Sequence, residues 1–431
     1  MISGTNSLDK FYRILDWIYP AYFLVYFVEF YTGMWRLSTL LKFACILLTF
    51  FYCASIIGKA KKSCRFFQLF GLYFLYCVFS IVWYAVNGIP IDCYLNELYN
   101  SLPAMFFVFV GLADDRKDRK FYERFAYSCT LMMLLGLFFY VTTPGWFVQR
   151  SMEAYERSPF HGTISEDTLL SSMRFSGFFR DVYEADMYAM VALSISLFMF
   201  FRNPKSKGEI WIFLMVIINL VAAILTQQRV AMASSVFTFL FYVVYCGVKG
   251  KSRKSRIMII GTLLLIAGMF SFVMIKAGDR LDQLSLLLGD RLENMSISEA
   301  YSERSNQHET IMEHFDMPLF GKGAGSGSTA AAYHGLPHIN DGGYWQVLYE
   351  FGIVGFLTFL FIMFRTVLRA VKIMRYYLIE LVIVSFVLVA MLGSNTLTIG
   401  YMLIVPFWYS IGRIWNRSLR KQYLQENIII K

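Results

Sequence analysis

The stretch AILTQQRVAMASS, residues 223–235, indicates how the chain is organised. It lies at the centre of residues 210–248, which are otherwise almost entirely apolar. About twenty apolar residues cross a hydrocarbon core of about 30 Å, so this length predicts two spans joined by a turn at Gln227, Gln228 and Arg229. An arginine at the bilayer centre costs about 2.5–3.5 kcal/mol on insertion scales, whereas the turn holds Arg229 at the membrane boundary.

Similar apolar runs recur along the whole chain. Hydrophobic residues make up 57% and charged residues 16% of the sequence, against about half and a quarter in soluble domains. We therefore predict an all-α polytopic membrane protein with about twelve transmembrane helices, forming one integral membrane domain over residues 1–431. The predicted spans are residues 15–32, 38–57, 66–86, 98–112, 125–143, 185–201, 210–226, 230–248, 257–275, 343–364, 376–393 and 399–415.

The net charge of +10 is concentrated in alternate connections between these spans. With a cytoplasmic N-terminus, all the basic connections fall on the cytoplasmic side, and both termini do as well. The basic excess then reflects topology and contact with acidic lipids rather than nucleic-acid binding, and it predicts a multi-pass membrane protein. The basic connections are residues 59–65, 116–124, 202–207, 249–256 and 365–375.

Two long connections, residues 144–184 and 276–341, fall on the outer side and form the expected catalytic region. They carry Arg174, Arg180 and Arg304, and Arg229 lies at the same outer rim. Guanidinium groups bind phosphate oxygens in pairs and stay charged, so their convergence would suit a lipid-linked diphosphate. The alternative is that these are solvated loop residues or that Arg229 reaches lipid phosphate.

The larger outer loop ends in GLPHINDGGYWQVLYEFGIVGF, residues 335–356. His338 and Asp341 could act there as acid–base groups, although a turn with Asp341 as a helix cap is the simpler alternative. Glu350 falls inside a predicted span and should face the interior, in contact with an arginine. The preceding tract GKGAGSGS, residues 321–328, matches no phosphate-binding glycine motif and reads as a flexible loop. The seven cysteines show neither metal-ligand nor disulfide spacing, which indicates packing roles.

Four segments together resemble the O-antigen polymerase and O-antigen ligase superfamily. They are LTQQR (225–229), RFSGFFRD (174–181), ERSNQHETIMEHFDMPLFGKGAGSG (303–327) and LYEFGIVGF (348–356). The resemblance spans residues 174–364 and the helix count. It implies a GT-C-like, metal-independent glycosyltransferase of the bacterial cytoplasmic membrane that needs no cofactor and takes its glycan from undecaprenyl diphosphate. It also implies that Arg229, Arg174 and Arg304 hold the diphosphate, and we expect Arg180 to support them.

One position favours a polymerase over a ligase. Ligases of this superfamily carry a His-Asn pair nine residues before the glutamate of an E-x-G motif, and that position here is Asp341, whereas His338 lies three residues earlier. A shifted alignment would restore the ligase. A lipid-linked glycan transporter is the second alternative, although the two halves of the chain show no repeat. Expected partners are undecaprenyl-diphosphate-linked oligosaccharides and membrane lipids, with a chain-length regulator as a further candidate.

Overall fold

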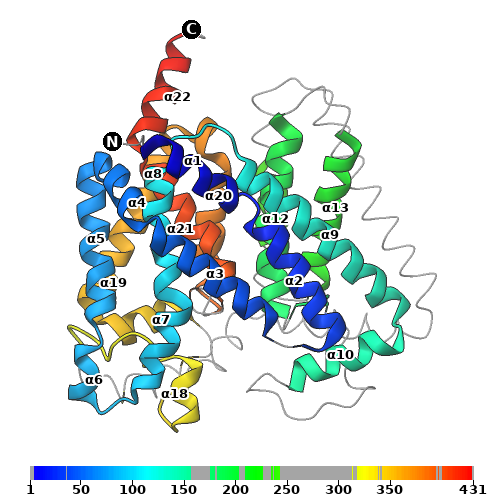
Figure 1. Cartoon of the computed structure of the whole chain (residues 1–431), viewed down its shortest axis with the longest axis horizontal. Helices are drawn as coiled ribbons and strands as arrows, with labels where there is room; N and C mark the ends of the chain where they lie inside the picture. Colours follow the sequence, from blue (N-terminus) through cyan, green and yellow to red (C-terminus); the bar gives the residue numbers. More distant parts are fainter. Residues whose placement is uncertain are drawn as a thin grey trace. The chain divides into compact units, whose positions relative to one another are not determined.

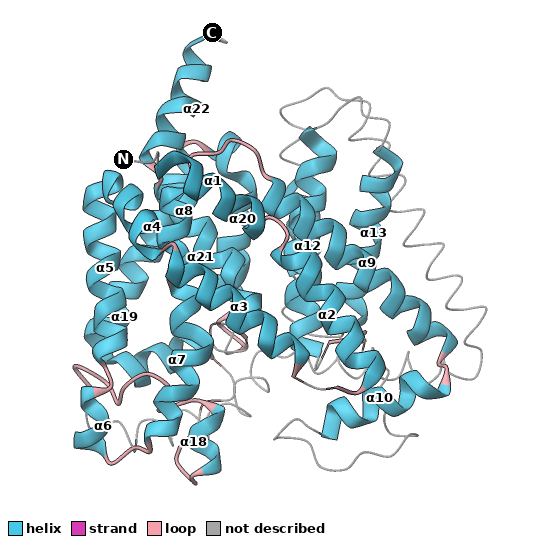
Figure 2. Cartoon of the chain, viewed as in Figure 1, coloured by secondary structure: helices cyan, strands magenta, loops and turns pink. Residues whose placement is uncertain are grey.

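The structure is a computed structural model. The part of the chain that it describes contains helices, turns and loops but no strand, which confirms the all-helical prediction (Figure 2). Contacts divide the chain into two units, residues 1–128 with 309–431 and residues 129–308, which are described separately. The described residues are 4–34, 36–156, 175–179, 182–202, 209–226, 234–235, 237–242, 313, 318–337, 339, 342–394, 397 and 400–429.

Unit 1 contains thirteen of the described α-helices and the beginning of α9 (Lys120–Thr142) (Figure 1). Their bounds are α1 Gly4–Leu15, α2 Ile18–Thr32, α3 Leu37–Phe51, α4 Cys53–Ala60, α5 Cys64–Phe79, α6 Val82–Asn87, α7 Ile91–Met105, α8 Phe107–Ala113, α18 Thr329–Tyr333, α19 Gly343–Lys372, α20 Met374–Ala390, α21 Tyr401–Trp415 and α22 Arg417–Ile429. Unit 2 contains the rest of α9, together with α10 (Gly145–Glu156), α12 (Val182–Arg202) and α13 (Glu209–Leu225).

Among the described residues, four helical segments are long and apolar enough to cross a membrane, and the bent pair of α3 and α4 makes a fifth. A helical membrane protein is therefore supported, while the predicted count of twelve is not reached. The predicted span 98–112 is divided between α7 and α8, with Pro103 just before the division, because proline removes a helical hydrogen bond. The predicted spans 230–248 and 257–275 lie mostly or wholly outside the described residues.

Helix α21 is buried within unit 1, and it packs directly on α8 through two glycines. A Cβ atom on Gly412 would lie 2.1 Å from the Val108 carbonyl oxygen, and one on Gly111 would lie 2.3 Å from that of Tyr409. Small residues allow two membrane helices to approach until their backbones touch. The two glycines therefore set the distance between α8 and α21.

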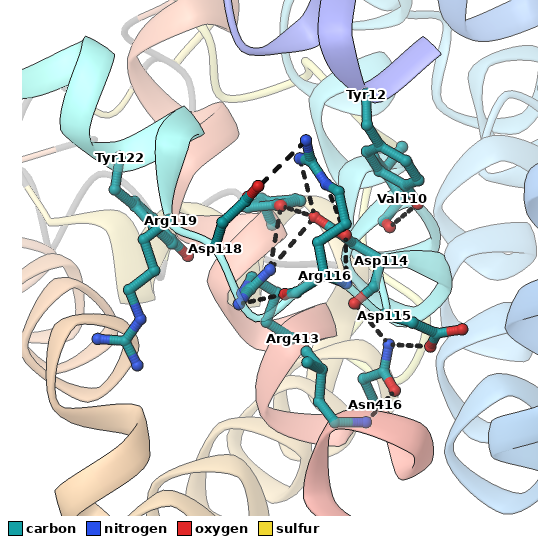
Figure 3. A network of polar contacts seen from close by, with 12 residues as sticks. Tyr12, Val110, Asp114, Asp115, Arg116, Asp118, Arg119, Tyr122, Arg413 and Asn416 are labelled. Atoms are coloured by element: carbon teal, nitrogen blue, oxygen red, sulfur yellow. Dashed lines mark hydrogen bonds and ion pairs between the residues drawn. The ribbon is translucent and has the colours of Figure 1, made fainter. Parts of the chain in front are cut away.

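A buried ionic network lies at the end of α8 and α21 (Figure 3). The Arg413 side chain, 1% exposed, donates to Asp114 Oδ2 and to Glu380 Oε1, each at 3.2 Å. Arg116 donates to both Asp16 oxygens at 2.9 and 3.1 Å and through Nε to Asp114 at 3.0 Å. The network therefore connects the start of α2, the α8–α9 connection, α20 and α21. It offsets the desolvation of each charge with charged partners.

The basic connections of unit 1 gather at this same end. Lys59 forms an ion pair with Asp115 at 3.1 Å, and Arg119 donates to the Tyr376 carbonyl oxygen. Arg369 donates to the Ile414 carbonyl oxygen at 2.9 Å, and α1 and α22 lie at this end as well (Figure 1). Three of the five predicted basic connections and both terminal helices therefore share one end of the unit. Connections 202–207 and 249–256 lie almost wholly outside the described residues.

Candidate functional site

The six predicted site residues, Arg174, Arg180, Arg229, Arg304, His338 and Asp341, all lie outside the described residues. Residues close in sequence to five of them, all but Arg304, are described, however, and these show how the surrounding motifs are anchored. The described neighbours are Phe175, Phe179, Thr226, Ile339 and Gly342.

In unit 2, two arginine-containing motifs are joined by a backbone hydrogen bond. The amide of Phe175, in the RFSGFFRD motif, donates to the carbonyl of Leu225, in the LTQQR motif, at 2.9 Å. The Phe175 ring lies 3.2 Å from the Cβ position of Gly136 on α9, and Gly177 has the positive φ of 59° that its turn requires. Residues 175–179 form a largely buried turn held against α9 and the end of α13.

In unit 1, the glycine tract 321–328 covers a break in α19. Gly352 there has φ 64° and ψ −173°, so the helical hydrogen bonds around it are interrupted. The tract replaces them: Lys322 and Gly323 donate to the carbonyls of Tyr349 and Glu350 at 3.0 and 2.8 Å, and Ile353 donates to the carbonyl of Pro318 at 2.8 Å. Non-helical backbone within a membrane helix requires such protein partners.

The interpretation of this tract as a flexible loop is therefore wrong. Gly321, Gly323 and Gly325 are buried and have φ values of 75°, 103° and 84°. A Cβ atom on Gly325 would lie 2.3 Å from the Cys93 carbonyl oxygen of α7. The glycines serve close backbone packing in the left-handed region, not mobility.

The Glu350 carboxylate lies beneath the glycine tract and is 3% exposed. Gln346 Nε2 donates to Glu350 Oε1 at 2.9 Å, and that oxygen lies 3.7 Å from the Cβ position of Gly327. The predicted interior position of Glu350 is confirmed. Its side-chain hydrogen-bond partner among the described residues is Gln346 rather than the arginine we expected.

A second buried acid, Glu97 on α7, lies near Glu350, and these two acids form what we call the buried centre. It is 2% exposed and close enough to Glu350 for the two charges to interact. The positive charge of Lys42 on α3 is close enough to attract the Glu97 carboxylate. Lys42 Nζ lies 2.5 Å from Asn100 Oδ1 and 3.2 Å from the centre of the Tyr99 ring. Two neighbouring carboxylates in one low-dielectric site favour sharing a proton or a cation. Lys42 is 8% exposed and so is buried within unit 1.

These acids line a cavity of about 40 Å³. A buried water needs about 10–15 Å³, so the cavity holds a few waters but not a sugar ring. The centre can hold protons, water or a small cation and can fix the loop above it; an oligosaccharide must bind elsewhere. Its lining includes Tyr73, Glu97, Ser101, Gln346, Glu350 and Trp408.

Sequence reasoning missed Glu97 and the burial of Lys42. Glu97 directly precedes a predicted span, where a carboxylate reads as an ordinary helix-end residue. The available signal was the presence of Glu97, Glu350 and Lys42 in or beside three different apolar runs, since charges there need partners.

Fold and centre together define an all-helical protein of the membrane class, with a buried acidic pair beneath a glycine tract. No protein-family model and no curated protein sequence matches the chain.

Proposed function

We propose that the protein is a polysaccharide repeat-unit polymerase of the cytoplasmic membrane. It transfers a glycan from an undecaprenyl-diphosphate carrier to another lipid-linked repeat unit at the outer face. The observation that carries the proposal is the hydrogen bond from Phe175 to Leu225, because it joins the motif that begins at Arg174 to the motif that ends at Arg229. Two sequence-distant arginine motifs that share an anchor are suited to one diphosphate.

The reaction requires stabilisation of a leaving group and removal of one proton. An acceptor hydroxyl oxygen attacks the anomeric carbon, the bond from that carbon to the phosphate oxygen breaks, and undecaprenyl diphosphate departs. Arg229, Arg174 and Arg304, supported by Arg180, are proposed to bind the diphosphate. A preorganised donor of this kind contributes about 3–4 kcal/mol to the transition state. Asp341 or His338 is proposed to accept the hydroxyl proton.

The buried centre is proposed to position the segment that carries these acid–base candidates. Ile339, between His338 and Asp341 in sequence, donates its amide to the Gly327 carbonyl at 3.0 Å and packs against Tyr349. Gly327 in turn lies against the Glu350 carboxylate, whose Oε1 is 3.7 Å from the Gly327 Cβ position. Glu350 is therefore a positioning residue in this proposal, and His338 or Asp341 acts on the substrate.

The test is complementation of a host from which the gene is deleted, with glycan chain length read on a gel. Arg229→Ala, Arg174→Ala and Arg304→Ala should each leave single repeat units on the lipid carrier. Arg365→Ala is the matched control, because Arg365 is exposed on α19 and outside the proposed site. Long glycans of normal abundance with all three site variants would contradict the proposal.

The ligase alternative is separated by its product. Loss of a ligase leaves long glycan on undecaprenol, whereas loss of a polymerase leaves single repeats. The same gels therefore distinguish the two activities.

A transporter is favoured by one structural observation, the interrupted helix α19 with Glu350 beside its break and Glu97 opposite. Broken helices and buried acids are common at transporter ion sites. Labelling of lipid-linked units at the outer face separates the classes. If the protein is a transporter, Arg229→Ala should leave the lipid-linked units at the cytoplasmic face. If it is a polymerase, the same variant should leave them at the outer face as single repeats.

A further inference from the structure

A cluster of three potential metal ligands lies in unit 1 at the N-terminal end of α7, away from the buried ionic network. Asp92 and Cys93 are in the first turn of α7, and His334 directly follows α18. His334 Nε2 lies 2.6 Å from Asp92 Oδ2, and one ligand atom from each of the three residues lies within 4.8 Å of the others. The two helices share the end of the unit that also holds α6 (Figure 1).

The chemistry of these side chains matches zinc. Zn²⁺ binds thiolate, imidazole and carboxylate at about 2.0–2.3 Å, which places the ligand atoms of a tetrahedral site about 3.3–3.8 Å apart. The observed cluster reaches that geometry if the Asp92–His334 contact opens and Cys93 Sγ approaches, movements of about 1 Å. Calcium and magnesium prefer oxygen ligands, so the thiol and the imidazole select against them.

Burial is distributed as a binding site requires. Cys93 is buried, whereas the side chains of His334 and Asp92 are 36% and 56% exposed, so an ion can reach the cluster from solvent. Asp92 Oδ1 accepts the Cys93 amide at 3.1 Å, which orients the carboxylate toward the cluster. An exposed hydrogen-bonded pair such as His334–Asp92 contributes little to stability by itself. An ion bound to all three residues would hold α18 to α7 much more firmly.

We propose that Asp92, Cys93 and His334 bind a zinc ion, with water in the fourth position. The site anchors α18, and with it the glycine tract that directly precedes α18, to α7. Gly325 of that tract already packs on the Cys93 carbonyl. The proposal goes beyond glycosyl transfer and does not depend on it.

The test is cobalt binding to the purified full-length protein in detergent, with any affinity tag removed and metals stripped by a chelator. Wild type should bind one Co²⁺ with a near-ultraviolet thiolate-to-cobalt band, and zinc should abolish the band and raise the melting temperature. Cys93→Ser should lack the band, whereas Cys53→Ser, which changes a cysteine of α4, should keep it. Asp92→Asn and His334→Gln should weaken binding by more than about tenfold, the loss that even an outer-shell substitution can produce.

Absence of a saturable band in wild type would show that Asp92 and His334 form an ion pair only, and would overturn the proposal. A band that survives Cys93→Ser would overturn it too. Because Asp92 and His334 are exposed, their variants test the site even if Cys93→Ser does not fold.

Discussion

At the residue scale, Gly325 shows why the glycine tract needs glycine. Its φ is 84°, and a Cβ atom would lie 2.3 Å from the Cys93 carbonyl and 2.7 Å from Glu97 Cγ. Gly325→Ala should therefore be less stable than wild type by the cost of a left-handed alanine backbone, about 1–2 kcal/mol. Displacement of the tract from α7 should lower the stability further. We expect a clear fall in melting temperature in detergent, and shorter glycans if the proposed function is correct.

Gly335→Ala separates these two effects. Gly335 has a similar φ of 67°, but nothing lies within 4 Å of its Cβ position. This variant should be destabilised only by the cost of its left-handed backbone, so its melting temperature should fall less than that of Gly325→Ala. Equal falls would mean that the contact with α7 contributes nothing.

At the element scale, the contact between α8 and α21 depends on Gly412. A methyl group there would lie 2.1 Å from the Val108 carbonyl oxygen and 2.9 Å from the Gly111 Cα atom. The two helices would have to separate, and overpacking of this kind costs about 1–3 kcal/mol. Gly412→Ala should therefore lower the melting temperature, as measured by thermal unfolding in detergent.

Gly71→Ala on α5 is the control at this scale, because nothing lies within 4 Å of the Gly71 Cβ position. Alanine favours a helix over glycine by about 1 kcal/mol, so this variant should be as stable as wild type or more so. If Gly412→Ala behaved like Gly71→Ala, the close approach of α8 and α21 would be wrong.

At the scale of unit 1, the ionic network around Asp114 makes stability depend on pH. Burial by itself would raise the pKa of Asp114, but the charges of Arg413 and Arg116 hold that pKa below its ordinary value of 3.8. A carboxyl group with a lowered folded-state pKa stabilises the protein above the unfolded-state pKa, and this stabilisation is lost as the pH falls through the folded-state pKa. Stability should therefore decline from about pH 4 downward.

Asp114→Asn tests this network. At neutral pH the variant should lose about 3 kcal/mol or more, because Arg413 keeps a buried charge with one partner fewer. Between about pH 5 and 3 it should then lose less stability than wild type, since one titrating partner is gone. Asp9→Asn is the control, because Asp9 is exposed on α1 and outside this network, and its pH profile should follow wild type. Parallel profiles for all three proteins would contradict the argument.

Several features of unit 1 were predictable from sequence because they depend on local composition. Long apolar runs predict helices wherever they occur. Spans of sufficient length lie in α9, α12 and α19, and in α5 together with the start of α6. The basic connections around Lys59, Arg116 and Arg369 were expected to share one side, and the structure places them at one end. The helix break at Gly352 was not predictable, because hydropathy continues across it. The division of α7 from α8 had a signal in Pro103, which the predicted span 98–112 ignored.

By itself, then, the sequence determined that the chain is helical, that several helices can span a membrane, and which connections carry its positive charge. Only the tertiary structure decided which polar groups meet. Asp92 and His334 are 242 positions apart, and the glycine tract reaches Glu97 across a similar separation. Hydropathy and charge are summed over neighbouring residues, whereas these contacts depend on how distant helices pack. No spacing within one segment could therefore predict them.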